Sequence, residues 1–208
     1  MFNFLFYPFK KIFNFLEGVG RYVELMWRVF RSLLSWNRYI NFTIDQMFQI
    51  GVLSIPIVIL TSLFSGMVTS VQAAYQFESG FVPNWFVGSI VGESVLMELA
   101  PMMTALVMTG KIGATITAEI GTMRVTEQID ALESLSFDPV SFLIMPRVLA
   151  AAIMFPMLVI VADFCGILGG LFAAHSAMDV SFQEFIRGFR TFFKPWDAWF
   201  GLIKGVFF

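Results

Sequence analysis

The stretch IGVLSIPIVILTSLFSGMVTSVQ, residues 50–72, decides the fold of this protein. It carries no charged side chain over 23 residues, and about 20 apolar residues are enough for a helix to cross the hydrocarbon core of a bilayer. Pro56 and Gly66 do not argue against a membrane helix, because such helices tolerate both residue types. We therefore predict that residues 50–72 form a transmembrane helix.

The composition of the whole chain agrees with a membrane protein. Of its 208 residues, 58% are hydrophobic and 13% are charged, whereas a soluble domain has about 25% charged residues. So few polar side chains cannot cover a soluble globule of this size. The net charge of −2 gives no basic surface of the kind that nucleic-acid binding requires.

Two further apolar runs are long enough to cross a membrane. The second begins near Trp85 and continues to about Gly110, and the third covers residues 140–174. At about 1.5 Å per residue, the third run exceeds a hydrocarbon core of about 30 Å. We therefore expect it to tilt, to kink at Pro146 or Pro156, or to protrude from the bilayer.

A fourth apolar run starts near Ala198 and reaches Phe208 after 11 residues, which is too short to span. We expect the natural sequence to continue beyond it. The segments between the runs, residues 73–84 and 175–197, are predicted to be loops. Together these features predict an all-α membrane protein with three complete spans and part of a fourth.

Residues 1–48 are basic and aromatic, and they contain no uncharged run of spanning length. Lys and Arg mixed with Trp, Phe and Leu are typical of helices that lie in the membrane interface. A cytosolic helical hairpin is the alternative. We therefore divide the chain into an N-terminal region of interfacial helices, residues 1–48, and a transmembrane domain, residues 49–208.

The distribution of Lys and Arg predicts the orientation of the chain. Six basic residues precede the first span and none lies in residues 73–84, so the N-terminus is expected in the cytoplasm. Residues 175–197 are then external, although they carry Arg187, Arg190 and Lys194. The larger N-terminal bias outweighs this conflict.

A polar segment between the second and third spans is predicted to form one amphipathic helix, from Thr122 to Ser136. Its apolar residues recur at helical spacing: Val125, Ile129, Leu132 and Leu135. Its acidic residues recur every third position: Glu127, Asp130 and Glu133. An acidic stripe favours docking to a basic partner in the cytoplasm. A helix resting on lipid headgroups is the alternative, but the negative cytoplasmic leaflet disfavours it.

Ionisable residues inside apolar runs are the other candidates for function, because such groups are costly to bury and are usually paired or functional. Glu98 lies near the middle of the second run and Lys204 lies in the fourth. We predict that they form an ion pair near a polar cavity; the alternative is that Glu98 faces water unpaired. Glu93 and Asp163 are candidates for lining the same polar region.

No residue pattern in the chain indicates an enzyme. Gly110-Lys111 lacks the other residues of a nucleotide-binding loop. The single histidine, His175, lies beside Ser176 at the end of a span, a place that favours an interfacial or loop histidine over a general base. We predict no catalytic residue, no metal site and no cofactor bound by this chain. A secondary transporter, an intramembrane enzyme and a membrane scaffold remain open as functions for such a chain.

The sequence MELAPMMTALVMTGKIGATITAEIGTMRVTEQIDALESLSFDPVSFLIMPRVLA, residues 97–150, resembles the signature region of the MlaE/YrbE family of lipid permeases. A weaker resemblance extends from about residue 45 to GLIKG at residues 201–205. The family's RELGP motif falls on residues 97–101, where Met97 replaces Arg and Ala100 replaces Gly. Its LIK motif falls on residues 202–204, which supports a buried role for Lys204.

The resemblance places the family's ATPase-coupling helix on residues 121–133. The residues that it implies in coupling are Gly121, Thr122, Arg124, Glu127, Gln128, Asp130, Ala131, Leu132 and Glu133. The residues considered for an intramembrane lipid cavity are Glu98, Lys204 and Glu93.

The resemblance also implies the assembly in which this chain would work. Family members are five-span permeases that form homodimers and move phospholipids or related lipids. A separate cytoplasmic ABC ATPase dimer holds ATP and Mg²⁺, a hexamer of MCE-domain subunits lies on the outer face, and some systems add a STAS-domain protein. The implied location is the inner membrane of a Gram-negative-type bacterium rather than a plastid inner envelope.

Overall fold

The protein is an all-α membrane protein, and 91% of the residues that the structure describes are helical. The computed structural model describes residues 7–32, 39–76, 83–178 and 180–208, and within them there is no strand. Parts of two predicted segments, residues 1–6 and 33–38 of the N-terminal region and residues 77–82 of the first loop, lie outside the described residues.

The first predicted span is confirmed, but its helix begins earlier than residue 50. The helices α2 (Ile40–Ile50), η3 (Val52–Ser54) and α3 (Ile55–Gln76) follow one another in a 37-residue helical segment that is long and apolar enough to cross a membrane. The short 3₁₀ turn precedes Pro56, which has no N–H for the carbonyls three and four residues before it. The predicted domain boundary at residues 48 and 49 lies inside α2.

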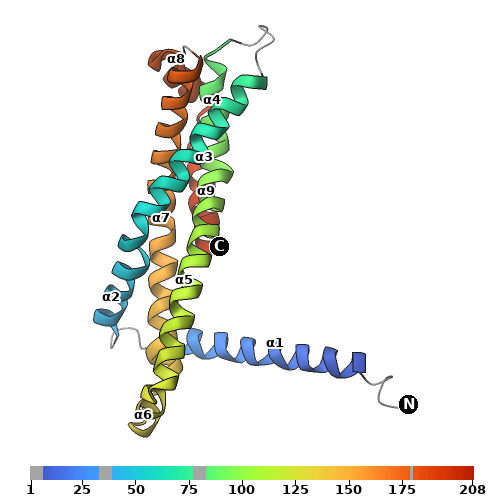
Figure 1. Cartoon of the computed structure of the whole chain (residues 1–208), viewed down its shortest axis with the longest axis vertical. Coiled ribbons are helices and arrows are strands. Elements are labelled where there is room, and N and C mark those ends of the chain that lie inside the picture. The colour runs from blue at the N-terminus through green and yellow to red at the C-terminus, as the bar shows by residue number, and fades with distance from the viewer. Residues whose placement is uncertain (1–6, 33–38, 77–82, 179) are drawn as a thin grey trace.

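The second and third spans are confirmed, and both extend beyond the predicted ends. The second consists of α4 (Phe86–Ser94), the π-helical turn η4 (Val95–Leu99) and α5 (Ala100–Val125). The third consists of the π-helical turn η5 (Val140–Ile144) and α7 (Met145–Met178), which continues through Pro156. These spans stand side by side as the bundle seen in Figure 1.

The predicted loop at residues 175–197 is wrong over most of its length: α7 continues to Met178, the middle forms the helix α8 (Phe182–Phe192), and the next helix begins at Pro195. Ser181 caps this helix: its hydroxyl accepts from the Glu184 N–H, and the Glu184 carboxylate accepts from the Ser181 N–H. Such a reciprocal cap starts a helix firmly. The fourth apolar run forms α9 (Pro195–Phe207), which packs on α5, α7 and η4.

Close helix packing in the bundle depends on glycines. A Cβ on Gly66 of α3 would lie 1.8 Å from the carbonyl oxygen of Gly166 on α7, and one on Gly88 of α4 would lie 2.2 Å from the Phe185 carbonyl oxygen on α8. Only glycine permits backbones to approach so closely. By contrast, Gly110 on α5 has no neighbour within 4 Å, and Ala114 and Ala118 are exposed.

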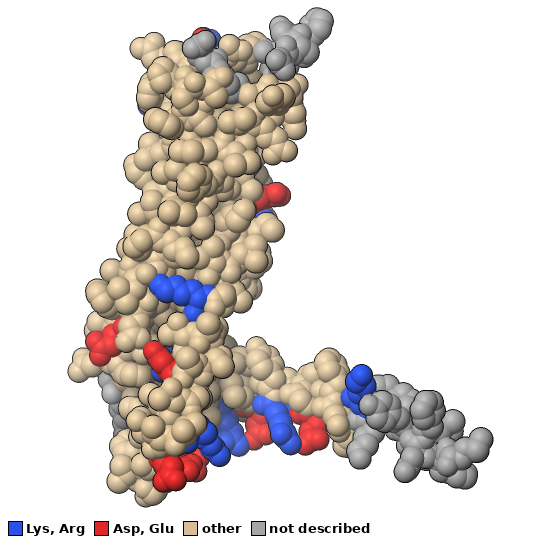
Figure 2. All heavy atoms as spheres, in the orientation of Figure 1, with Lys and Arg blue, Asp and Glu red and all other residues tan. Residues whose placement is uncertain are grey.

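Two elements project from the bundle at the same end. The helix α1 (Tyr7–Ser32) runs roughly perpendicular to the spans, and the short helix α6 (Gln128–Ser134) follows α5 beyond the end of the bundle (Figure 1). Charged side chains gather at this end and along the side of α1 that faces away from the bundle (Figure 2). Phe13, Trp27 and Phe30 of α1 are exposed, a surface that suits the predicted interfacial role.

Candidate functional site

The predicted docking segment lies at the charged end of the bundle, but it is not one helix. The helix α5 continues to Val125, and the chain turns at Thr126 and Glu127 before α6 begins. Glu127 has a φ of 58° in the left-handed region, which a right-handed helix cannot include. The hydroxyl of Thr126 donates to the Thr122 carbonyl at 2.8 Å and covers one of the last carbonyls of α5.

The turn disperses the apolar stripe that the spacing predicted. Ile129 is buried and attaches α6 to the bundle, and Leu132 is half-buried. Val125 is 85% exposed and Leu135 is exposed as well, because the two residues lie outside α6 and no longer share its face. The prediction of one four-residue apolar face is therefore wrong.

The polar residues of the segment are available to a partner. Glu127, Asp130 and Glu133 are all exposed, and the 3.9 Å approach of Arg124 to Asp130 is the one ion pair that any of them makes among the described residues. The other residues implied in coupling are also exposed: Gly121, Thr122, Gln128 and Ala131. The structure thus presents an acidic, solvent-exposed tip on a helix that runs through the bundle.

The predicted ion pair between Glu98 and Lys204 is not formed. The Lys204 ammonium donates instead to the carbonyl oxygen of Met97 at 2.8 Å and lies 4.6 Å from the centre of the Phe200 ring. Pro101 explains why the Met97 carbonyl is open to Lys204, because proline has no N–H to donate to the carbonyl four residues before it. Glu98 is exposed on η4, which agrees with the alternative that it faces outward.

Glu93 and two aspartates, Asp163 and Asp197, do not gather with Glu98. Glu93 is exposed on α4 and lines a small cavity together with the buried Asp197 at the start of α9. Asp163 is 9% exposed on α7, and its Oδ1 has no hydrogen-bond partner. The predicted polar region is therefore divided among several places along the bundle.

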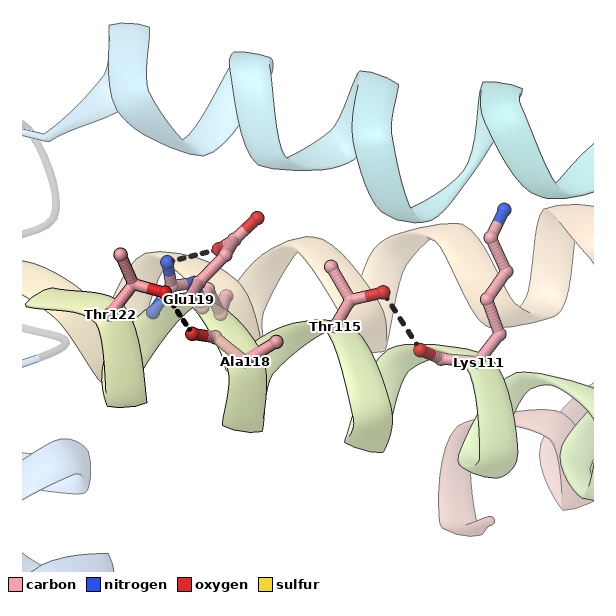
Figure 3. Close-up of polar contacts among 6 residues, drawn as sticks. Lys111, Thr115, Ala118, Glu119 and Thr122 are labelled. Atoms are coloured by element: carbon pink, nitrogen blue, oxygen red, sulfur yellow. Dashed lines mark hydrogen bonds and ion pairs between the residues drawn. The ribbon is translucent and has the colours of Figure 1, made fainter.

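A partly buried ion pair that the sequence pattern did not predict joins α5 to α7. Arg147 is 2% exposed, and its Nη2 lies 2.5 Å from Oε2 of Glu119 on α5 (Figure 3). The Arg147 Nε and Nη1 atoms are buried without a partner. Both residues are ionisable groups at the ends of apolar runs, and that signal would have identified them.

Lys111 forms a second polar contact on the same helix. Its ammonium donates to the Leu53 carbonyl at 2.7 Å and to the Ser54 hydroxyl at 2.8 Å, both on the 3₁₀ turn before Pro56. Figure 3 shows Lys111 and Glu119 projecting from the same side of α5. A cavity of about 30 Å³ lies between these two residues and α2, which is room for a water molecule.

Polar contacts inside the bundle link α5 to η3 and α7, and α9 to η4. Lys111 and Lys204 each bind a backbone carbonyl that precedes a proline, and Glu119 holds α5 to α7. Within the described residues, no three His, Cys, Asp or Glu side chains are grouped to hold a metal ion. The polar contacts therefore connect helices to one another in an otherwise apolar bundle.

Comparison with known proteins places this arrangement among transport proteins. A family model described as "Permease MlaE" matches residues 43–208. A "Probable ABC transporter permease protein" of Rickettsia felis is 36% identical over 199 residues, which cover 95% of this chain and 76% of that protein. The "Intermembrane phospholipid transport system permease protein MlaE" of Haemophilus influenzae is 32% identical over 200 residues, covering 96% and 76%.

A plant relative is more distant. The chloroplastic protein TRIGALACTOSYLDIACYLGLYCEROL 1 of Arabidopsis thaliana is 28% identical over 185 residues, which cover 89% of this chain and 51% of that protein.

Proposed function

Because this chain belongs to the MlaE family of ABC transporter permeases, we propose that it moves phospholipids or related hydrophobic lipids between membranes. ATP hydrolysis takes place on a separate cytoplasmic ABC ATPase dimer that holds ATP and Mg²⁺. The name of the Haemophilus influenzae relative supports phospholipid as the substrate class. The membrane is the inner membrane of a Gram-negative-type bacterium.

The observation that carries the proposal is the exposed acidic tip at the end of α5. Glu127, Asp130 and Glu133 project into solvent, so they can meet a basic groove on the ATPase, and complementary charge fixes how two such surfaces dock. Ile129 attaches the tip to the bundle, so a force on α6 acts on α5 as well.

Two contacts give α5 a route for passing that movement into the membrane. The Glu119–Arg147 ion pair connects α5 to α7, and Lys111 connects it to the turn between α2 and α3. Because a helix is stiff along its axis, displacement at α6 shifts these contact points together. The spans then rearrange around a lipid cavity at the interface of a homodimer, and the lipid passes to or from an MCE-domain hexamer on the outer face. A STAS-domain protein completes the complex in some systems.

Charge reversal at the tip tests the proposal. The double variant Glu127→Lys and Glu133→Lys should reduce co-purification of the ATPase about tenfold or more, since each reversal replaces attraction by repulsion. Asp45→Lys is the control, because Asp45 is an exposed acid on α2 and is not part of the tip. Lipid transport in proteoliposomes that contain the ATPase should fall in parallel.

Thermal unfolding of the double variant in detergent should match that of the parent protein, since both glutamates are exposed. Full ATPase retention and full transport by the double variant would contradict docking at α6. Transport driven by an ion gradient without any ATPase would instead identify a secondary transporter.

A further inference from the structure

The helix α8 has three distinct faces at the end of the bundle opposite α6 (Figure 1). One face is sealed against α4: Phe185 is buried, and a Cβ on Gly188 would lie 1.8 Å from the Trp85 carbonyl oxygen. A second face exposes the apolar side chains of Phe182 and Ile186. The third is polar and contains two arginines, so α8 is amphipathic on its free surface, as helices at a membrane interface are.

The polar face borders a shallow, open groove of about 420 Å³ whose lining residues all belong to α8. Arg187 and Arg190 line it together with Gln183, Ile186 and Thr191. Among the described residues, neither arginine has a carboxylate within ion-pair distance. The groove therefore presents two guanidinium groups, whose planar donor arrangement matches a phosphate.

The nearest acid on α8 is held away from the arginines. The Glu184 carboxylate accepts from the Ser181 N–H at 3.0 Å and from the Ser181 hydroxyl at 3.0 Å. The hydrogen bond from the Ser181 backbone N–H contributes most to lowering the pKa of Glu184, and the one from the Ser181 hydroxyl contributes next. The carboxylate therefore stays ionised within the cap. Arg187, one turn further along, is left for a ligand from outside the chain.

An apolar groove of about 430 Å³ begins beside the same helix. It lies between α3 and α7 and is lined by Leu63, Met67, Leu168, Phe172 and, from α8, Phe182. Phe182 is one helical turn, about 6 Å, from Ile186 of the polar groove. The apolar groove and the arginine groove therefore adjoin along one side of α8.

We propose that this composite surface binds one phospholipid, with its phosphate between Arg187 and Arg190 and an acyl chain in the α3–α7 groove. Charge complementarity selects the phosphate, and the apolar lining selects the chain. The site accounts for two arginines on a segment that basic-residue bias places outside the cytoplasm. The inference rests on the proposed function only in treating the bound lipid as cargo.

The test uses the full chain in detergent micelles and a phosphatidylglycerol that carries a photoreactive group on one acyl chain. Mass spectrometry should find the label on α3 and α7 peptides that contain Met67 or Phe172. Arg187→Gln with Arg190→Gln should reduce this labelling about tenfold, the loss expected for about 1.4 kcal/mol of phosphate binding. Lys194→Gln, which removes a nearby exposed charge outside the groove, should leave it unchanged.

Two further ligands separate the sources of the signal. A photoreactive diacylglycerol with the same chains but no phosphate should label these peptides at least tenfold less. Inorganic phosphate in excess, compared with chloride at equal ionic strength, should not displace the phospholipid. Equal labelling by diacylglycerol would reduce the site to general lipid contact, and displacement by phosphate would identify a free-anion site; either result overturns the proposal.

The labelling experiment tests the lipid site, and the transport experiment tests the proposed function, so either proposal can be refuted without the other. If the arginine variants label like the parent protein, the lipid site is refuted while the transport function stands. If the parent protein is labelled as expected but moves no lipid with its ATPase, the transport function is refuted while the site stands.

Discussion

The hydrogen bond from Lys204 to the Met97 carbonyl compensates for a proline in a membrane helix. Replacing Lys204 by Met leaves that carbonyl unpaired in an apolar setting, which should cost about 1–3 kcal/mol of stability. The change Lys204→Met combined with Pro101→Ala should cost less, because the introduced alanine supplies the N–H that proline lacks. Thermal unfolding of the single and double variants in detergent measures the coupling.

Glu98→Gln provides the contrast for this prediction. Since Glu98 is exposed and makes no ion pair with Lys204, the change should alter stability by no more than about 0.5 kcal/mol. Equal losses for Lys204→Met and Glu98→Gln, with no rescue by Pro101→Ala, would restore the ion pair as the better account.

Removing Glu119 and removing Arg147 from their ion pair should lower the stability of the protein by different amounts. Glu119→Gln leaves a buried guanidinium uncompensated and should cost about 3 kcal/mol, at the low end for a buried pair because Glu119 is partly exposed. Arg147→Met removes the charge together with two unpaired N–H groups and should cost less. Chemical unfolding in detergent gives the order, and a larger loss for Arg147→Met would contradict it.

At the scale of elements, the contact between α3 and α7 depends on Gly66. Gly66→Ala places a methyl group against the Gly166 backbone, which cannot move aside as a side chain could, and should cost about 1–3 kcal/mol. Gly20→Ala on α1 is the control: nothing lies within 4 Å of its Cβ position, so helix propensity should make it neutral or stabilising. The unfolding temperatures of the two variants test the prediction, and a fall of similar size for Gly20→Ala would show that the loss is not specific to the α3–α7 contact.

For the whole molecule, the proposed orientation places α6 and α8 on opposite sides of the membrane. With Cys165 replaced by Ala, a single cysteine at Ser134 should react with a membrane-impermeant maleimide only after cells are permeabilised. A single cysteine at Gln183 should react from the outside, because both positions are exposed and lie at opposite ends of the bundle (Figure 1). Reaction of both cysteines from one side would contradict the orientation.

The sequence by itself determined the membrane class, the three spans and the position of the acidic segment. These properties depend on uncharged length and on helical spacing, which are local along the chain. Tertiary structure alone decided where the buried charges find partners. Lys204 meets a carbonyl 107 residues away and Arg147 meets a carboxylate 28 residues away, and neither separation leaves a periodic signal.

The same physics explains two of the structural predictions that failed. The spacing of apolar residues suggested one helix at residues 122–136. The left-handed Glu127 instead separates α5 from α6, and the Thr126 hydroxyl donates to the Thr122 carbonyl at that turn. Charge sign suggested that Glu98 attracts Lys204, but a carbonyl left open by Pro101 lies within reach of the ammonium. In an apolar bundle an unpaired backbone carbonyl competes with a carboxylate for the same ammonium, and only the packed helices determine which of the two it reaches.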